Sequence, residues 1–422
     1  MSDLNVINAT CLARVSDSGT ARRGPEQGEL NLLADGAVAI RDGLIAAVGP
    51  TDEILDQWGD DVQTLDATGM TVLPGLIECH SHPLFAGSRH AEYARRLAGA
   101  SLLQIAADGG GIWATVQATR EATETELLDG LRHAYHRILA GGVTTLEVKS
   151  GYGLTEATEL HQLTLLAQSR SMTPMSLAIS FLGAHVVPGG LDAEEYTGQV
   201  LQMLAKVVDQ GIAAFHDITC ERGLFTPAQA GRLFARSREL GIATKAHADA
   251  WARSEGWRTA VAGDAVSAEH LTYTPDDEIR EVGETDTIAV LLPQAELVYM
   301  TDRRANARLL IDQQVPVAIA TDYCSSIHAT ALTTTIGIAA PWFSITPSQA
   351  IVATTLNAAY ALRLAGDRGS IDSGKRGDLT ILTVEHPDEL CLAVGQHVVG
   401  EVIVAGEPVL RHDPTATHER QA

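Results

Sequence analysis

The stretch Gly75-Leu76-Ile77-Glu78-Cys79-His80-Ser81-His82 is an apolar run that ends in two histidines one residue apart. Side chains of an extended strand repeat on every second residue, so His80 and His82 point to the same side. Two imidazoles at a strand end can bind one metal ion, although a His-x-His pair alone is a weak signal. The fold and the function therefore depend on whether other strands supply further ligands.

After Pro74, short apolar runs alternate with amphipathic segments. Val143–Lys149 is rich in β-branched residues, and Thr123-Glu124-Thr125-Glu126 before it has the form of a helix capping box. Counting from Leu76, eight such runs follow, and the last predicted helix extends from Thr346 to about Leu362. This alternation predicts a parallel sheet covered by helices, and eight units indicate a (β/α)8 TIM-like barrel. An open doubly wound sheet is the alternative, but no glycine-rich dinucleotide fingerprint follows the first strand.

Both ends of the chain differ from its centre. Residues 1–72 hold short apolar runs and turns, with a hairpin signal at Asp42-Gly43, and residues 367–422 return to that pattern. We therefore predict an α/β barrel over residues 73–366. The two ends are expected to build one small β-sandwich domain together.

The composition limits the possible partners. The chain has 422 residues, 45% of them hydrophobic, and a formal net charge of −23. A large core is feasible, whereas nucleic acid and anionic membranes need a basic face and are excluded. Five scattered cysteines indicate free thiols in a reducing compartment. Without a signal-peptide pattern or a long apolar run, we expect a cytoplasmic protein, with its oligomeric state open and a homodimer as one option.

The carboxyl ends of barrel strands meet at one rim, where active sites lie. At this rim the sequence would place His80 and His82, Lys149, His185, Cys220 and Glu221, His247, His270, and Asp322. A single histidine is more often a hydrogen-bonded residue than a ligand. Four histidine-bearing strands and a final aspartate at one rim, without clustered cysteines, favour a catalytic metal site over a structural one.

The expected ligands of one divalent ion are His80, His82, His247 and Asp322. Such an ion would lower the pKa of a bound water and polarise a carbonyl, and Asp322 can accept the proton of that water. His270 or His185 could orient the water or donate to the developing oxyanion. This set of groups predicts metal-assisted hydrolysis of a carbon–nitrogen bond.

Longer motifs carry a resemblance to a known family. The histidine stretch, the late Thr321-Asp322 and the closing segment 374–379 (GKRGDL) are similar to those of the amidohydrolase superfamily. Within it, the chain resembles imidazolonepropionase of histidine breakdown over nearly its whole length. The segments that carry this resemblance are 85–89 (FAGSR), 109–112 (GGGI), 147–154 (EVKSGYGL), 181–185 (FLGAH), 245–249 (KAHAD), 267–271 (SAEHL) and 289–293 (AVLLP).

The resemblance implies hydrolysis of 4-imidazolone-5-propionate to N-formimino-glutamate with one Zn²⁺ or one Fe²⁺/Fe³⁺ ion. It implies the same four metal ligands, and contacts from Arg89, Tyr152 and His185 to the substrate. A guanidinium at Arg89 suits a propionate tail, because it matches a carboxylate in shape and charge. Without the surrounding motifs, Arg89 would be assigned to a surface ion pair and Tyr152 to a half-buried loop.

The chain departs from the family pattern at three places that would face the substrate. Ala250 stands where the family usually has Glu or Gln, Leu102 stands where it often has Tyr, and the loop after Asp322 lacks the usual Asn-Pro-Gly-type sequence. Cys324 and Ser325 of that loop are expected to contact the substrate. Either the substrate is unchanged, or the ring carries a substituent between its nitrogens, as in the 2-thioxo compound of ergothioneine breakdown.

Two other classes of function remain as alternatives. A barrel that has lost catalysis would need no ligand set, and the chain retains one. A deaminase of an aminated ring would share the metal, but Arg89 and Tyr152 suit a carboxylate tail better.

Overall fold

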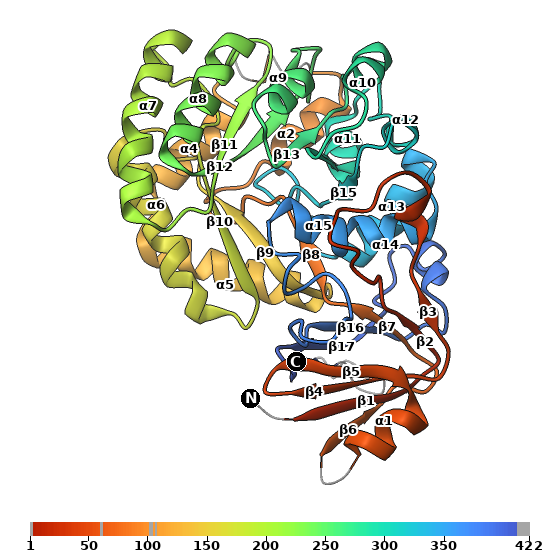
Figure 1. The fold of residues 1–422 in the computed structure, drawn as a ribbon. Helices are drawn as coiled ribbons and strands as arrows, with labels where there is room; N and C mark the ends of the chain where they lie inside the picture. Colours follow the sequence, from red (N-terminus) through yellow and green to blue (C-terminus); the bar gives the residue numbers. More distant parts are fainter. Residues whose placement is uncertain (1–2, 60–61, 101–103, 106–107, 412–422) are drawn as a thin grey trace.

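The protein is described by a computed structural model, which covers residues 3–59, 62–100, 104–105 and 108–411. Figure 1 shows strands enclosed by helices in one body, and sheets that contain both ends of the chain in a smaller one. This confirms the predicted fold class, a TIM-like barrel with a small β-sandwich built from both termini. The limits of the predicted segments, 1–72, 73–366 and 367–422, stay predictions.

Eight strands form the barrel wall, and each pairs with its neighbours in the sequence. They are β8 (Leu76–Glu78), β9 (Val143–Lys149), β10 (Ser176–Ala184), β11 (Phe215–Cys220), β12 (Ala243–Ala248), β13 (Ser267–His270), β14 (Ile288–Leu291) and β15 (Val317–Ile319). Every pairing between consecutive strands is parallel. The carboxyl ends therefore meet at one rim, as the sequence predicted.

Helices connect the strands and cover the outside of the barrel (Figure 1). The longer ones are α4 (Ile112–Glu121), α5 (Glu124–Ala140), α6 (Glu156–Gln168), α7 (Ala193–Gln210), α8 (Pro227–Leu240) and α13 (Leu332–Phe343). The shorter ones are α2 (His90–Leu97), α9 (Gly256–Ala262), α10 (Asp276–Val282), α11 (Pro293–Tyr299), α12 (Ala307–Asp312), α14 (Pro347–Ala353) and α15 (Leu356–Ala361), with 3-10 turns η1 (Gly24–Gly28), η2 (Ser169–Met172) and η3 (Pro387–Cys391). The capping box expected before α5 is confirmed, since Thr123 and Glu126 each accept the other's backbone N–H.

The single helix expected from Thr346 to about Leu362 is wrong, because it is broken between α14 and α15. The hydroxyls of Thr354 and Thr355 bond back to carbonyls four residues earlier, at 3.0 and 2.7 Å. The carbonyl of Thr354 accepts the N–H of Ile77 at 2.9 Å and is thus used outside the helix. This break ties the end of the chain's helical part to the first barrel strand.

The barrel closes between its first and last strands without a continuous ladder. Beyond the ends of β8 and β15, Ser81 and Tyr323 form an isolated parallel bridge. The N–H of His82 donates to the carbonyl of Tyr323 at 2.7 Å. The segments after the two strands, which carry three of the expected metal ligands, are therefore held side by side.

Two sheets build the smaller body. One contains β1 (Leu4–Ala9), β4 (Gly36–Arg41), β5 (Leu44–Pro50) and β6 (Gln63–Asp66), and the helix α1 (Thr51–Trp58) packs on it. The other contains β2 (Cys11–Ala13), β3 (Leu32–Leu33), β7 (Thr71–Pro74), β16 (Leu379–Leu382), β17 (Val399–Val404) and β18 (Glu407–Arg411). Their buried apolar side chains share one core, which makes the pair a sandwich. The hairpin expected at Asp42-Gly43 is confirmed by the antiparallel pairing of β4 and β5.

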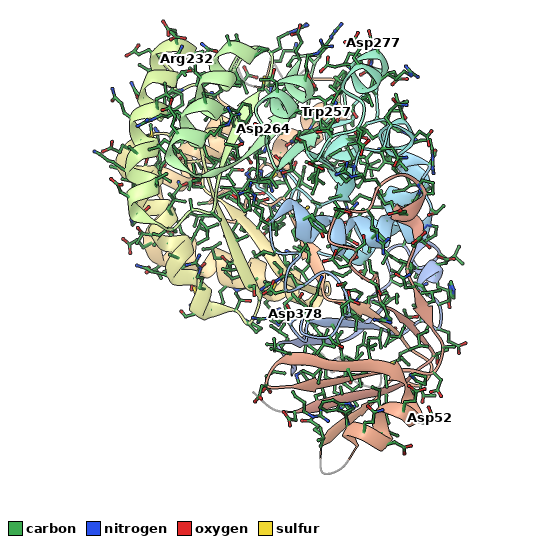
Figure 2. All side chains as sticks on the ribbon, in the orientation of Figure 1. Asp52, Arg232, Trp257, Asp264, Asp277 and Asp378 are labelled. Carbon is green, nitrogen blue, oxygen red and sulfur yellow. The ribbon has the colours of Figure 1, made fainter. Side chains whose placement is uncertain are left out.

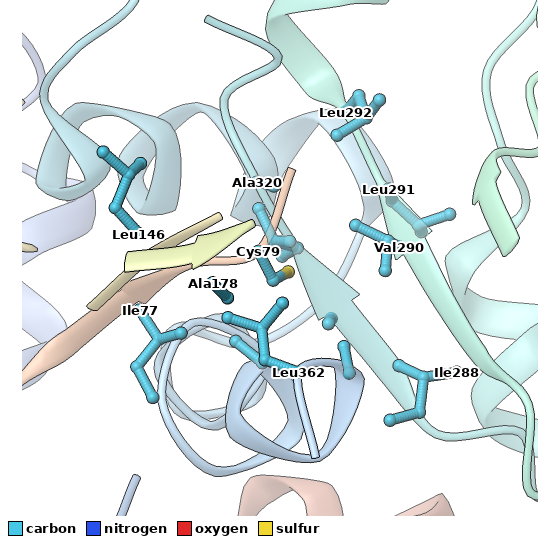
Figure 3. Packing of buried hydrophobic residues seen from close by; sticks show 14 of the residues in the cluster. Ile77, Cys79, Leu146, Ala178, Ile288, Val290, Leu291, Leu292, Ala320 and Leu362 are labelled. Atoms are coloured by element: carbon cyan, nitrogen blue, oxygen red, sulfur yellow. The ribbon is translucent and has the colours of Figure 1, made fainter. Parts of the chain in front are cut away.

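A continuous apolar core supports the barrel. Figure 3 shows Ile77, Leu146 and Val290 from separate strands packed in one region with Leu362 beyond α15. The charged residues Asp52, Arg232 and Asp277 lie on the outside of the molecule (Figure 2). Within the described parts of the chain, no helix combines the length and the apolar character needed to span a membrane.

Candidate metal and active site

The rim of the barrel brings the expected ligands together. His80 and His82 follow β8, His247 lies near the end of β12, and Asp322 follows β15. All four side chains are at least nine-tenths buried. His80, His82 and Asp322 follow the first and last barrel strands, β8 and β15, whereas His247 lies on β12 in the middle of the sheet order. The fold, rather than nearness in the sequence, therefore brings them together.

The ligand atoms of these residues lie close together around Nε2 of His82. Nε2 of His80 lies 3.2 Å from Nε2 of His82, which lies 3.4 Å from Nε2 of His247. Oδ1 of Asp322 lies 3.5 and 3.6 Å from Nε2 of His80 and His82. Four tetrahedral ligands at about 2.1 Å from one metal ion are separated by about 3.4 Å. His80, His82 and Asp322 have the spacing expected of ligands to one ion, and His247 adjoins this group through His82.

Two histidines of the cluster, His80 and His82, are poised to bind as neutral ligands. Burial lowers the pKa of His80 and His82 well below the usual value, and the neighbouring positive groups lower it further. Burial also acts to lower the pKa of His247, but the charge and the hydrogen bond of Asp217 outweigh it and raise this pKa. Neutral imidazole is the form of histidine that coordinates metal ions.

Asp217 fixes the ring of His247. Its Oδ1 lies 3.0 Å from Nδ1 of His247. Because a carboxylate can only accept, Nδ1 carries a hydrogen, and Nε2 is the nitrogen that faces the cluster and would bind a metal ion once it is unprotonated. A hydrogen-bonded partner of this kind behind a histidine is typical of metal sites in proteins.

Asp322 differs from an ordinary surface aspartate. Burial raises the pKa of its carboxyl group to about 7, against the opposing effects of His247 and Lys149. Its backbone has a φ of 56°, which is the left-handed region that non-glycine residues seldom adopt. A carboxyl group with a pKa near 7 can both hold and release a proton at neutral pH.

His185 and His270 flank the cluster. The His185 ring stacks on that of His82 with 5.4 Å between the ring centroids, and Nδ1 of His185 lies 3.0 Å from the carbonyl oxygen of Gly151. This nitrogen must be the donor, and burial lowers the pKa of His185 to about 3, so Nε2 is a neutral acceptor. The ring of His270 lies 5.4 Å from that of His247, and burial lowers its pKa as well. The catalytic roles of both residues stay predictions.

A cavity of about 440 Å³ opens over the cluster, within the usual range for small-molecule sites. Its lining includes His82, Arg89, Tyr152, His185, His247, Ala250, Trp251, His270, Tyr299, Asp322, Cys324 and Ser326. More of the exposed lining is apolar than polar. Most of the residues predicted from the sequence to act on a substrate thus border one small space.

Two substrate contacts implied by the resemblance border this cavity. The guanidinium of Arg89 pairs with Glu92 at 2.9 Å, which orients it from the start of α2. Tyr152 is buried on a loop whose N–H groups at Gly153 and Leu154 donate to Glu159 at 2.8 and 2.7 Å. Gly151 of this loop has a φ of 116° and lies so close to Leu182 that a Cβ would clash.

The positions that depart from the family pattern do not all face the cavity. Ala250 and Cys324 line it. Ser325 instead turns its hydroxyl to Thr115 at 2.7 Å, and the adjacent Ser326 lines the cavity. A contact of Ser325 with substrate stays a prediction, and Leu102 lies outside the described residues.

Sequence reasoning missed three residues of the cavity wall. Trp251 and Tyr299 meet edge to face at 5.2 Å, and the hydroxyl of Tyr299 lies 2.9 Å from that of Ser326. Glu221 was noted at a strand end but given no role. Its carboxylate accepts the N–H of Ala250 at 2.5 Å and so fixes the turn after β12. The aromatic pair lies on loops and helix ends, where neither strand periodicity nor motif spacing singles it out.

Comparison with known proteins shows the family of the chain. The amidohydrolase family matches residues 71–409, and an imidazolonepropionase-like composite domain of bacteria matches residues 36–60. An imidazolonepropionase of Geobacillus sp. (strain WCH70) is 38% identical over 97% of this chain and 99% of the relative. One of Haloarcula marismortui is 36% identical over 92% of each chain.

Solved structures agree on the fold. A zinc-bound adenosine deaminase from Xanthomonas campestris covers 97% of this chain and 93% of its own, with 20% identity and a TM-score of 0.73. The guanine deaminase of E. coli covers 98% of this chain and all of its own, with 14% identity and a TM-score of 0.74. These two show the fold alone, whereas the family match and the more similar relatives show the family. The chain belongs to the amidohydrolase family, as an imidazolonepropionase-like member, and is a hydrolase of carbon–nitrogen bonds.

Proposed function

We propose that the chain hydrolyses the ring of 4-imidazolone-5-propionate and forms N-formimino-glutamate. The observation that carries this proposal is the close approach of three Nε2 atoms and one carboxylate oxygen, each 3.2–3.6 Å from a neighbour, beside a cavity bordered by Arg89, Tyr152 and His185. Relatives at 35–38% identity that bear the name imidazolonepropionase support the same reaction.

One divalent ion, Zn²⁺ or iron, would be held by His80, His82, His247 and Asp322. A bound ion of this kind supplies a water of lowered pKa and polarises the carbonyl that is attacked. The ligand set contains no cysteine, which leaves both metals compatible with it. Metal analysis of the purified protein distinguishes them.

Asp322 is the residue we assign to proton transfer. Water adds to the ring carbonyl carbon, the bond from that carbon to the ring nitrogen breaks, and the nitrogen needs a proton. The Asp322 carboxylate accepts the proton of the attacking water at Oδ and returns it to the leaving nitrogen. Of the four proposed ligands, Asp322 alone carries a carboxylate, which can accept a proton and return it.

The remaining residues bind and orient the substrate. His185 presents an acceptor at Nε2, which fits a ring N–H. Arg89 offers its guanidinium to the propionate, and the hydroxyl of Tyr152 is a second donor to the substrate. Each of these contacts is made by a side chain that is already fixed by the protein, so little ordering is needed on binding.

The 2-thioxo ring is the alternative substrate that we retain for the same site. Ala250, Trp251 and Cys324 border the cavity with a methyl group, an indole and a thiol, and none of them carries a charge. A ring with sulfur between its nitrogens is larger and less basic at that edge, which is why we retain the 2-thioxo analogue. The relatives named above support only the unsubstituted ring.

The test compares both compounds with one preparation of metal-loaded protein. N-formimino-glutamate is measured by mass spectrometry, and sulfide by a colorimetric assay. We expect N-formimino-glutamate from 4-imidazolone-5-propionate, at a rate that falls to background in Asp322→Ala. Sulfide from the 2-thioxo compound, with little turnover of the first, would replace the first function by the second, and turnover of neither would overturn the proposal.

A further inference from the structure

A layer of charged side chains lies inside the barrel, directly behind the histidine cluster. It consists of Glu147, Lys149, Asp217, Lys245 and Glu269, and all of them are fully buried. None is among the expected metal ligands. Burying charges in an apolar barrel is costly unless they are paired closely, so such a layer indicates a requirement beyond packing.

Lys149 connects this layer to His247. Its Nζ lies 2.7 Å from Oδ2 of Asp217 and 2.8 Å from Oε1 of Glu147. The other oxygen of Asp217 accepts the Nδ1–H of His247 at 3.0 Å. One carboxylate therefore joins the ammonium group to the ring that faces the metal position.

Lys245 lies in the same layer with different partners. Its Nζ bonds to Glu147 Oε2 at 2.6 Å and to the carbonyl oxygen of Cys79 at 2.9 Å, and it lies 3.4 Å from Glu269 Oε1. Glu269 Oε2 remains 3.9 Å from Nδ1 of His80 and of His247, too far for a hydrogen bond. Within the described contacts, Lys245 thus bonds to the backbone before His80, but not to a carboxylate that is hydrogen-bonded to an expected ligand.

We infer that Lys149 is a positioning residue for the metal site, acting through Asp217. Its ammonium group holds the Asp217 carboxylate against Nδ1 of His247. This fixes the tautomer and the angle at which Nε2 faces the cluster. Without Lys149, Asp217 loses its closest counter-charge, and His247 loses a rigid hydrogen-bond partner. The orientation of its Nε2 toward the metal position is then less well fixed. This inference rests on the metal site of the proposed function.

Lys149→Met and Lys245→Met make a matched pair, because each removes one fully buried ammonium group bonded to Glu147. Stripped protein is titrated with Co²⁺ in competition with a chelator, and the absorption of bound Co²⁺ reports its ligand geometry. We expect Lys149→Met to bind Co²⁺ about 10–100-fold more weakly, with an altered spectrum. Lys245→Met is expected to lose thermal stability but to bind Co²⁺ within about threefold of the natural chain.

Asp217→Asn is nearly isosteric and keeps an oxygen that can accept from His247, so it carries the test if Lys149→Met does not fold. We expect it to weaken Co²⁺ binding as well. Equal Co²⁺ affinity in folded Lys149→Met or in Asp217→Asn would overturn the inference, as would an equal loss in Lys245→Met. A natural chain that binds no Co²⁺ would overturn the proposed function together with it, so the two failures are distinguishable.

Discussion

The carboxyl group of Glu78, whose pKa burial raises to about 8, accepts the backbone N–H of Thr321 at 3.0 Å, across 243 residues of sequence. Its other oxygen accepts the N–H of His80, also at 3.0 Å. Glu78 ends the first barrel strand, and Thr321 directly precedes Asp322. One buried side chain therefore links the backbone beside two expected metal ligands at the seam where the barrel has no continuous ladder.

Replacing Glu78 by glutamine should weaken this link. The amide nitrogen of Glu78→Gln would face one of the two N–H donors, leaving that donor unpaired in a buried place. We expect a loss of about 1–3 kcal/mol in the free energy of unfolding, measured in urea, and less metal per chain. Glu195→Gln, on the exposed surface of α7, is the control and should change stability by less than about 0.5 kcal/mol. Equal stability of the two variants would contradict the role of Glu78.

Metal binding should depend on pH through Asp322. Because burial raises its pKa to about 7, the metal-free site holds a proton on Asp322 below that pH, and a metal ion must displace it. We therefore expect affinity to fall as the pH drops below about 7, by up to about tenfold per pH unit from this group alone. Above pH 7 the Asp322 proton no longer competes. Competition titrations between about pH 5.5 and 8.5 test this, and a flat affinity would contradict it.

Arg89 should act on substrate binding rather than on the chemical step. Arg89→Met would remove the charged hydrogen bond proposed to the propionate, and kcat/KM is expected to fall about 10–100-fold, mainly through KM. Arg95→Met removes a guanidinium from the same helix α2, where Arg95 pairs with Asp108 on the surface, and should have little effect. With the natural chain, a substrate whose tail is a neutral amide should lose as much kcat/KM as Arg89→Met loses with the propionate substrate. With Arg89→Met, this amide substrate should be turned over no more slowly than the propionate substrate. A substantial further loss would show that Arg89 acts elsewhere.

Cys324 should not be a nucleophile, although it borders the cavity. Burial raises the pKa of its thiol to about 12, so the thiolate is scarce at neutral pH. Cys324→Ser is expected to keep kcat within a few-fold, and the metal-loaded protein should react slowly with iodoacetamide at this residue. Loss of turnover in Cys324→Ser, with metal content unchanged, would assign Cys324 a part in the chemistry.

The sequence predicts the barrel and its ligands for one physical reason. Barrel strands are short apolar runs, and their last residues face a common rim, so His80, His82, His247 and Asp322 could be placed together by position. Position places Lys149, His185 and His270 there as well, and the family resemblance is what singles out the four as ligands. The break between α14 and α15 was not predictable in this way. It depends on the Thr354 carbonyl bonding to Ile77, a contact between distant parts of the chain.

The charged layer was missed although its signal is present. Glu147 and Lys149 alternate within one strand, as do Lys245 and His247 in another, and charged residues at a period of two inside apolar runs point into the barrel. The sequence alone does not give their partners, because Lys149 and Asp217 belong to different strands. Likewise, whether Ser325 or Ser326 faces the cavity depends on a loop conformation that no periodicity fixes.

The most direct test of the account is turnover by protein stripped with a chelator and then reloaded with one equivalent of metal per chain. The substrate is 4-imidazolone-5-propionate, and formation of N-formimino-glutamate is followed by mass spectrometry. The account predicts background turnover in the stripped chain, full recovery at one equivalent, and no recovery in His247→Ala or Asp322→Ala. Equal turnover with and without metal, or full activity in Asp322→Ala, would contradict the claim that these residues form a metal-dependent hydrolytic site.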